Sequence, residues 1–560
     1  MTTTSPATGA GSGPTPEPGT DRMWTSRLRH GVFDGLPPDR LLPDEQPAYV
    51  ASWIYVFGVL TLAALGVIVL SGLWLAFMGP EWWHGSDVGR FVNSLHFWSV
   101  QIFFFTMVVH LWGKFWMAAW RGRRVLTWVT GAVAFLASVG TAFSGYLVQT
   151  NFDSQWIAAE AKDGLNSVGI GAWFNVLDVG QALLIHVALL PLVLAMIVVW
   201  HVLLVRRRGV VPPIDQLTDG SDLIGTSSTV PAPRAATSAR SSDRDPAAMP
   251  WRGPVRRYDI VKEFVVAMTV VTLLTVGLAA LLSSPDEKAL TLKSWAASAP
   301  NDFVLTASTE LDGTSGTASY GAPYVDLPGV GQHIGPLHLQ EWAGVRTPVD
   351  TVNSFVVDPL RTVPRKGLAL TGALRLWDGA DTAQHQKWAA AYTEALGKAP
   401  DNDPAQVPAS TAFGPVPVMT AALLAQARSG ALDGPVALGG KFFQTDYTTS
   451  VLFLADGTYL EDKAVAQHLG GDQSGMMNET GSYPGQEWLW LYTFWYQIKP
   501  FSSEANSWGA NADAVIWGIM AILSLGLVLL PYVPGVRSVP RWIPVHRLVW
   551  KRWYAEHPRT

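Results

Sequence analysis

LHFWSVQIFFFTMVVHLWGK, residues 95–114, is an apolar run that carries two histidines, His96 and His110. A helix that crosses a bilayer needs about 20 mostly apolar residues, and this run is long enough. An imidazole in hydrocarbon is costly unless it faces a partner, a water-filled cavity or a metal. The run therefore predicts a membrane helix whose histidines point into a protein interior.

The composition is that of a membrane protein with a soluble part. Of the 560 residues 49% are hydrophobic and only 15% are charged, whereas soluble domains have about 25% charged residues. The absence of cysteine excludes disulfides, thiolate catalysis, cysteine-ligated iron–sulfur clusters and thioether-attached heme. The net charge of −5 gives no indication of a nucleic-acid partner.

Six segments are long and apolar enough to cross a membrane. They are residues 51–77, 93–117, 126–149, 179–205, 260–282 and 512–533.

The segments between and beyond these spans differ in composition, and we expect six parts. These are a disordered tail (1–22), a four-helix bundle (23–210), a linker (211–256), the fifth span (257–283), an inserted domain (284–483), and a final part with the sixth span and a basic tail (484–560). In the inserted domain SVLFLADGTYL (450–460) predicts a strand and HQKWAAAYTEALGK (385–398) a helix. We therefore expect an α+β domain.

Basic clusters predict the orientation in the cell membrane, because loops rich in Lys and Arg stay in the cytoplasm. Such clusters occur near the N terminus, between spans two and three, after span four, before span five and at the C terminus. Alternating spans place all of these clusters on one side. Both termini are then cytoplasmic, and residues 284–500 lie outside.

Two pairs of histidines recur at matched depths. His96 and His110 are fourteen residues apart, about 21 Å along a helix, and His186 and His201 are fifteen apart, about 22 Å. Spans two and four run in the same direction, so His96 pairs with His186 near the outer side and His110 with His201 near the inner side. This geometry suits two bis-histidine hemes, although a single such histidine is as often a packing residue.

Glycines repeat the same interval on the other two helices. Gly58 and Gly72 in span one are fourteen residues apart, as are Gly131 and Gly145 in span three. Glycine allows close backbone approach of a flat macrocycle. The alternative is ordinary packing of helices through small residues.

Together with LTWVTG (126–131) and TAFSGYL (141–147), these pairs resemble the cytochrome b subunit of the cytochrome bc, or quinol–cytochrome c reductase, family in its Gram-positive, actinobacterial form. The resemblance implies an all-α membrane protein with a four-helix diheme bundle and two further spans. It also implies two heme b groups whose iron is ligated by His96 and His186, and by His110 and His201. The inserted domain would be an addition.

Two further segments resemble the quinone sites of that family. YDIVKEF (258–264) would place Lys262 and Glu263 at an inner quinone site, and YPGQEWLWLYTFWYQIKPF (483–501) would place Glu487 at an outer quinol-oxidising site, as the proton acceptor. Gln486 and Leu489 stand where the family has Pro and Tyr. By local sequence alone, Glu487 is also compatible with a surface ion pair, and Lys262 and Glu263 fit an interfacial charged pair at a helix start at least as well as a quinone site.

The resemblance implies oxidation of a quinol, expected to be menaquinol, in a respiratory complex. A Rieske iron–sulfur protein, a cytochrome c subunit, membrane lipid and a second copy of the chain would be its partners. The altered 486–489 segment and the extra domain keep a second reading open, in which the electrons pass to another extracytoplasmic reductase. A third reading is a transporter or receptor without heme, whose histidines bind a substrate or protons.

Overall fold

The computed structural model describes residues 41–214, 253–282, 287–438, 445–467, 469, 486–503 and 505–557. The predicted tail 1–22 and most of the predicted linker, residues 215–252, lie outside the described residues.

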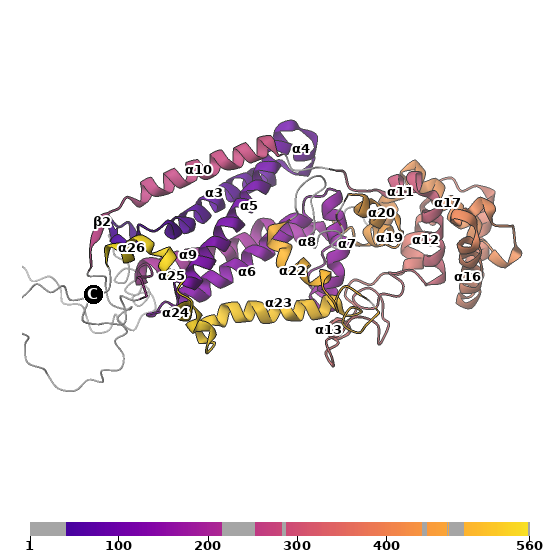
Figure 1. Ribbon diagram of the computed structural model, residues 1–560. Coiled ribbons are helices and arrows are strands. Elements are labelled where there is room, and N and C mark those ends of the chain that lie inside the picture. Colours follow the sequence, from indigo (N-terminus) through magenta and orange to yellow (C-terminus); the bar gives the residue numbers. More distant parts are fainter. Residues whose placement is uncertain are drawn as a thin grey trace, which may run out of the picture.

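Six helices in the described residues are long and apolar enough to cross a membrane, which confirms the predicted spans to within a few residues, except that the second begins earlier, at Asp87. In Figure 1 they are α3 (Val56–Met78), α5 (Asp87–Trp116), α6 (Val125–Leu147), α8 with α9 (Val179–Leu184 and Leu190–Arg208), α10 (Ile260–Leu281) and α23 (Ala512–Leu529).

Side-chain caps define the beginnings of three of these helices. An oxygen of each capping residue accepts a hydrogen bond from a first-turn backbone amide, an interaction worth about 1 kcal/mol. The caps are Ser86 for α5, Asp178 for α8 and Asp259 for α10.

The spans pack as two helix pairs with two outer helices (Figure 1). Helix α3 packs along α5 and α6 along α9, while α10 covers α3 and α5, and α23 lies against α6 and α7 (Phe152–Ser167). Half of the apolar window of α5 is buried, compared with 11% for α8 and α9. Helix α5, which carries two of the histidines, is therefore the most enclosed of the six.

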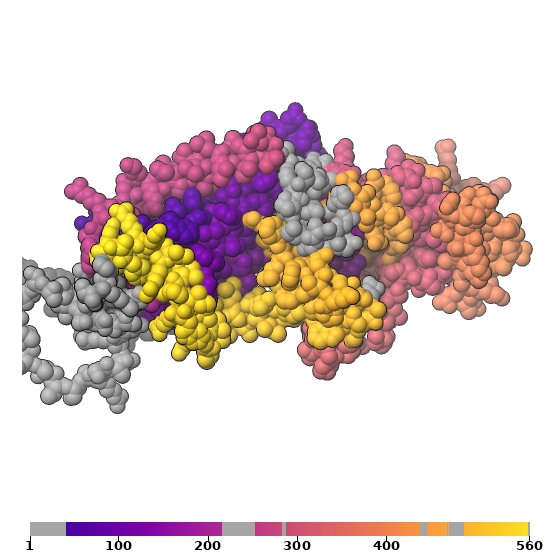
Figure 2. Space-filling model, viewed as in Figure 1, coloured from indigo at the N-terminus to yellow at the C-terminus, as the bar shows by residue number. Residues whose placement is uncertain are grey.

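The two ends of the bundle differ. At one end, strand β1 (Glu45–Pro47) pairs with β2 (Val255–Arg257) near the C-terminal helix α26 (Lys551–Glu556). The inserted domain lies at the opposite end (Figure 1). Figure 2 shows the domain as a lobe beyond the bundle, with residues 486–503 lying where lobe and bundle meet.

The described part of the inserted domain is helical. Its helices are α11 (Leu292–Ser298), α12 (Pro300–Asp312), α13 (Leu339–Ala343), η8 (Val352–Val357), α14 (Asp358–Thr362), α15 (Leu368–Asp378), α16 (Thr382–Lys398), α17 (Val416–Ser429), α18 (Asp433–Leu438), α19 (Thr448–Ala455) and α20 (Tyr459–Ala466).

The helix predicted over 385–398 is confirmed as part of α16, but the strand predicted over 450–460 is wrong. Residues 450–455 continue α19, Asp456 to Thr458 form a turn, and Tyr459 begins α20. Leu452, Phe453 and Leu454 are buried together in a core of helices. A short run of consecutive apolar residues has no period that separates a buried strand from a buried helix. The described part of this domain contains isolated bridges but no sheet, so the strands of the α+β expectation are not confirmed there.

One continuous core joins the domain to the bundle. It includes Tyr146 and Leu147 at the end of α6, Phe152 and Trp156 of α7, and aromatic residues of the domain such as Trp295. Helix α7, which follows the third span, thus serves as the platform on which the inserted domain rests.

Candidate functional site

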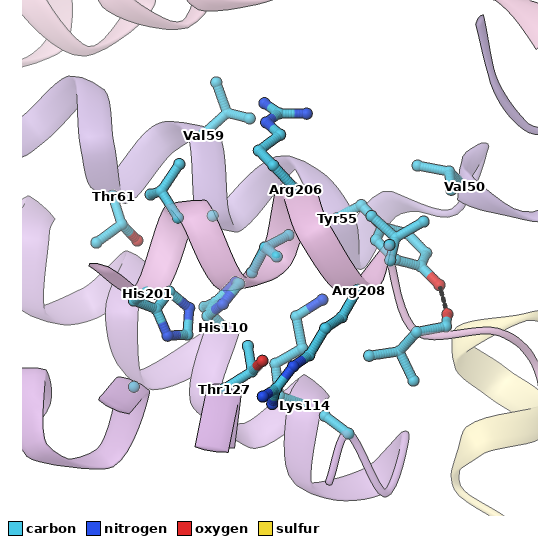
Figure 3. A pocket seen from close by; sticks show the side chains of 18 of the residues that line it. Val50, Tyr55, Val59, Thr61, His110, Lys114, Thr127, His201, Arg206 and Arg208 are labelled. Atoms are coloured by element: carbon cyan, nitrogen blue, oxygen red, sulfur yellow. Dashed lines mark hydrogen bonds between the residues drawn. The ribbon is translucent and has the colours of Figure 1, made fainter. Parts of the chain in front are cut away.

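The four predicted histidines lie at two levels of the bundle. His96 and His110 are on α5, His186 is in the π-turn η5 (Ile185–Leu189) and His201 is on α9. His96 and His186 line one pocket, and His110 and His201 line another. Figure 3 shows His110 and His201 side by side. The structure thus brings together the same two pairs that the spacing suggests.

The π-turn at His186 has a local cause. Pro191 follows it at the start of α9, and proline has no amide hydrogen and collides with the carbonyl four residues earlier. The helix accommodates this by widening for one turn, a feature frequent at functional sites. The widened turn sets the direction of the His186 side chain.

Each of the four predicted glycines faces one of the four imidazoles. Gly58 faces His110, Gly72 faces His96, Gly131 faces His201 and Gly145 faces His186. A β-carbon at Gly145 would lie 2.5 Å from Cε1 of His186, and at the other three positions 2.9–3.0 Å from Cε1 of the facing ring. Any larger residue would push the ring away from its present position.

Three of the four imidazoles are held through Nδ1 by the hydroxyl that precedes the facing glycine. The distances are 3.0 Å from Ser71 to His96, 3.1 Å from Thr130 to His201 and 3.2 Å from Ser144 to His186. Sequence reasoning missed these hydroxyls, although the dipeptides Ser71-Gly72, Thr130-Gly131 and Ser144-Gly145 are a signal that could have found them.

The hydrogen-bond directions determine the tautomer of these three rings. Each hydroxyl donates its hydrogen to a carbonyl of its own helix, as Thr130 does to Leu126 at 2.9 Å. The hydroxyl oxygen must then accept from Nδ1–H of the imidazole. His186 Nδ1 also lies 3.0 Å from the carbonyl oxygen of Thr141, which can only accept. Nε2 therefore keeps its lone pair, the arrangement found in histidines that ligate metals.

His110 is the exception. Its Nδ1 is buried without a hydrogen-bond partner among the described residues. The residue before its facing glycine is Phe57, which has no hydroxyl to offer.

The outer pair has the geometry of two imidazoles that share a metal ion. The ring centroids of His96 and His186 are 6.5 Å apart and the ring planes are at 87°. An ion bonded to one nitrogen of each ring at about 2.1 Å, as zinc is, would separate the ring centres by two bonds and two ring radii, roughly 6 Å. The space now left between the side chains is about 90 Å³, so this level fits a heme by ligand geometry rather than by volume.

The inner pair opens into a much larger cavity of about 1180 Å³, more than the roughly 300–1,000 Å³ of common cofactor pockets. Lys114 and Arg208 lie beside this pair (Figure 3), and Lys114 is 4.7 Å from the centre of the Tyr55 ring. Seven basic residues line the cavity against two acidic ones, Glu45 and Glu263. The basic residues are Lys114, Arg123, Arg124, Arg206, Arg207, Arg208 and Arg256. This level fits an anionic macrocycle by both volume and charge.

Glu487 lies in the short helix η12 (Glu487–Leu489), next to the outer pair. Its neighbours Gln486 and Trp488 line the outer pocket with the two histidines. Gln486 accepts hydrogen bonds from Gln101 of α5 at 2.7 Å and from Trp488 at 3.1 Å. Oε1 of Glu487 is buried without a partner among the described residues. Burial raises the pKa of Glu487 to about 7.

Lys262 and Glu263 lie in the first turn of α10 but face different surroundings. Glu263 lines the inner cavity together with Tyr258, whereas Lys262 is exposed and does not line it. Burial and the adjacent Glu263 raise the pKa of Tyr258. Of the predicted pair, the structure brings only Glu263 to the histidine site.

The described arrangement is a helical membrane bundle with two buried imidazole pairs, and the comparisons agree with it. Residues 101–286 match the family model described as cytochrome b (N-terminal)/b6/petB. The match includes His110, His186 and His201 and ends at residue 286, within the first residues of the inserted domain. This part of the chain is therefore similar to the cytochrome b/b6 family.

Individual relatives match about a third of the chain. A cytochrome b6 of Heliobacterium modesticaldum is 26% identical over 30% of this chain and 89% of its own length. A cytochrome bc complex cytochrome b subunit of Chlorobaculum thiosulfatiphilum is 29% identical over 31% and 46%. A menaquinol:cytochrome c reductase cytochrome b subunit of Geobacillus thermodenitrificans is 23% identical over 35% and 96%.

Proposed function

We propose that the chain is a diheme cytochrome b that carries electrons from menaquinol across the bilayer as a subunit of a cytochrome bc-type complex. His96 with His186, and His110 with His201, would each hold the iron of one heme b. When bound, heme supplies reversible one-electron transfer. The names of the Geobacillus and Bacillus subtilis relatives, which are menaquinol:cytochrome c reductase subunits, support the choice of quinol.

The observation that carries this proposal is that neighbouring residues fix the tautomer and the orientation of the imidazoles. Three rings are fixed in the Nδ1–H tautomer by hydroxyls, and all four face a glycine. Histidines that only fill space need neither feature. A transporter that binds protons at these histidines would protonate them at Nε2, and because the His96 and His186 rings are only 6.5 Å apart this would place two cations together, which is unfavourable.

Glu487 is the candidate proton acceptor for quinol oxidation. A general base works best when its pKa is near the operating pH, and burial raises the pKa of Glu487 to about 7. Its partnerless Oε1 is available to a quinol hydroxyl. At the inner cavity, Glu263 is the carboxylate placed to hold a proton near a quinone, whereas Lys262 would reach it only by turning inward.

Visible absorption of the purified chain tests the proposal. A reduced-minus-oxidised spectrum should show two b-type hemes, and a colourless preparation would support the transporter or receptor reading. His186→Ala should remove one heme and leave the other, with the inner heme as internal control. Retention of both hemes in the folded variant would contradict the ligand pairing.

The partners follow from the same reading. We propose a Rieske iron–sulfur protein, a cytochrome c subunit and a second copy of the chain as partners, with both termini in the cytoplasm and the inserted domain outside.

One feature favours the second candidate function, delivery of the electrons to a different extracytoplasmic reductase. Gln486 and Leu489 replace two residues of the segment that resembles the quinol site, and the side chain of Gln486 is hydrogen-bonded to Gln101 of α5. Reduction of added cytochrome c by the isolated complex distinguishes the two.

A further inference from the structure

A small apolar hairpin lies at the domain end of α23. Ile334 and Leu337 pair in both directions, each amide donating to the other residue's carbonyl at 3.0 Å. The turn between them is Gly335-Pro336, and Gly335 has φ +57°, which glycine adopts without strain. The rings of His333 and His338 stack at the base of the hairpin, 5.0 Å apart.

Hydrogen bonds fix this hairpin to the first turn of α23. Gln332 donates to Asp513 at 2.6 Å and accepts from the amide of Ala514 at 3.2 Å, and the amide of His333 donates to Asn511 at 2.8 Å. These bonds set the direction in which the tip projects.

The tip extends along the membrane helix instead of away from it. The Cδ1 atom of Ile334 lies 3.4 Å from the position that a β-carbon at Gly518 would occupy. Gly518 is six residues into α23, about 9 Å below its first residue. Below the polar first turn, α23 turns exposed apolar residues outward, among them Ile522 at 72% and Leu525 at 59% exposure. The hairpin therefore continues the lipid-facing surface of α23.

The chemistry of the tip suits hydrocarbon. Backbone polar groups in lipid must be satisfied internally. Here Ile334 and Leu337 satisfy each other's amides and carbonyls and Pro336 has no amide hydrogen, so the backbone groups of the tip without a backbone partner are the amide of Gly335 and the carbonyls of Gly335 and Pro336. Leu337 is 43% exposed, and the nearby Trp342 is 63% exposed. Tryptophan is enriched at the boundary between membrane and water.

We propose that the hairpin of residues 333–338 inserts its tip into the lipid leaflet at the domain end of α23, with Trp342 at the interface. The domain would then be anchored to the membrane at a second point besides its connection to the bundle. Lipid is the occupant because the tip is continuous with a surface that already faces lipid.

The absence of cysteine from the chain allows a direct test. Leu337→Cys at the tip, and Leu368→Cys on α15 as a control that is 95% exposed, are labelled with an environment-sensitive fluorophore. The full chain is placed in phosphatidylcholine nanodiscs. We expect the label at 337 to be quenched severalfold more by doxyl-labelled lipid than by aqueous iodide, and the label at 368 to show the reverse.

Two results would overturn the proposal. A label at 337 that iodide quenches as strongly as at 368 would place the tip in water. A label protected from both quenchers would place it against protein, such as a second copy of the chain. If Leu337→Cys loses the far-UV circular dichroism of the parent, Trp342→Cys provides the same comparison at the interface.

Discussion

At the scale of single residues, the site is defined by how each imidazole is held. Ser71, Thr130 and Ser144 each accept from an Nδ1–H and leave Nε2 free. The partners that orient ligating histidines tune metal affinity nearly as much as the ligands themselves. The missing hydroxyl at His110 therefore makes the two imidazoles of the inner level unequal, because His201 is held by Thr130 and His110 is not.

Thr130→Val should weaken heme binding at the inner level. Valine has the same shape but no oxygen to accept from His201, and loss of such a partner costs about 10–100-fold in metal affinity. Transfer of heme to an excess of apomyoglobin measures the loss.

Thr269→Val is the matched control, because the hydroxyl of Thr269 bonds only to the carbonyl of Val265 in the described structure. Equal heme transfer from the two variants would show that the Thr130 contact does not orient a ligand.

Glu487→Gln should change the pH dependence of quinol oxidation. A base with a pKa of about 7 is about one-tenth ionised one pH unit below that value, so the rate of the parent should rise by about tenfold from pH 6 to its plateau. The glutamine variant cannot accept the proton, and its rate should be low and flat over this range. If the rate of quinol oxidation by the parent does not change between pH 6 and 8, Glu487 is not the proton acceptor.

At the scale of elements, one face of helix α6 packs against the imidazole rings of His201 and His186. Gly131 faces His201 and Gly145 faces His186, whereas Gly140 on the same helix has nothing within 4 Å of an added β-carbon. The fourteen-residue interval is close to four turns, which keeps the two ring-facing glycines on one side of the helix.

Gly145→Ala should therefore lower occupancy of the outer heme, because the new methyl would lie 2.5 Å from Cε1 of His186. Gly140→Ala should leave both hemes in place and stabilise the helix by roughly 1 kcal/mol. The α-band amplitudes of the two hemes in a redox titration measure both effects. Equal spectra for the two variants would show that Gly145 is a packing residue and is not required for heme binding.

At the scale of the whole molecule, the inserted domain contains a buried pair of carboxyl groups, those of Glu310 and Asp456. Glu310 is fully buried and accepts from Ser315 at 2.6 Å, and the Asp456 carboxylate, whose charge acts on Glu310, accepts from the amide of Thr317 at 2.8 Å. Burial first, and then the charge of Asp456, raise the pKa of Glu310 well above its usual 4.5. The pair thus retains a proton in the folded state.

Stability of the domain should fall as pH rises above 4.5. Glu310 then loses its proton in the unfolded chain but keeps it in the folded one, so unfolding releases a proton and becomes easier by up to about 1.4 kcal/mol per pH unit. This contribution is complete below 4.5 and is lost as pH rises through the folded pKa.

Glu310→Gln places a neutral amide of nearly the same shape beside Asp456 and removes the titration of residue 310. Its thermal midpoint should therefore depend less on pH than that of the parent. Parallel curves for parent and variant between pH 5 and 9 would show that Glu310 is already ionised in the fold.

The spans and the histidine and glycine positions could be read from the sequence because each is a local or strictly periodic property. Length and hydropathy define a membrane helix, and an interval of fourteen or fifteen residues fixes relative depth and face. The strand expected over 450–460 shows the limit of this reasoning. Residues such as Phe453 are simply apolar, and whether they pair as a strand or pack as a helix depends on neighbours far away in the chain.

The sequence alone determined six membrane helices and the two levels of paired histidines, since the bilayer and the helical repeat leave few other solutions. Only the tertiary structure decided which nitrogen is free in three of the four imidazoles, that Glu263 and not Lys262 faces the inner cavity, and that the inserted domain rests on α7. Those features depend on side chains brought together across tens to hundreds of residues, where no local pattern records the contact.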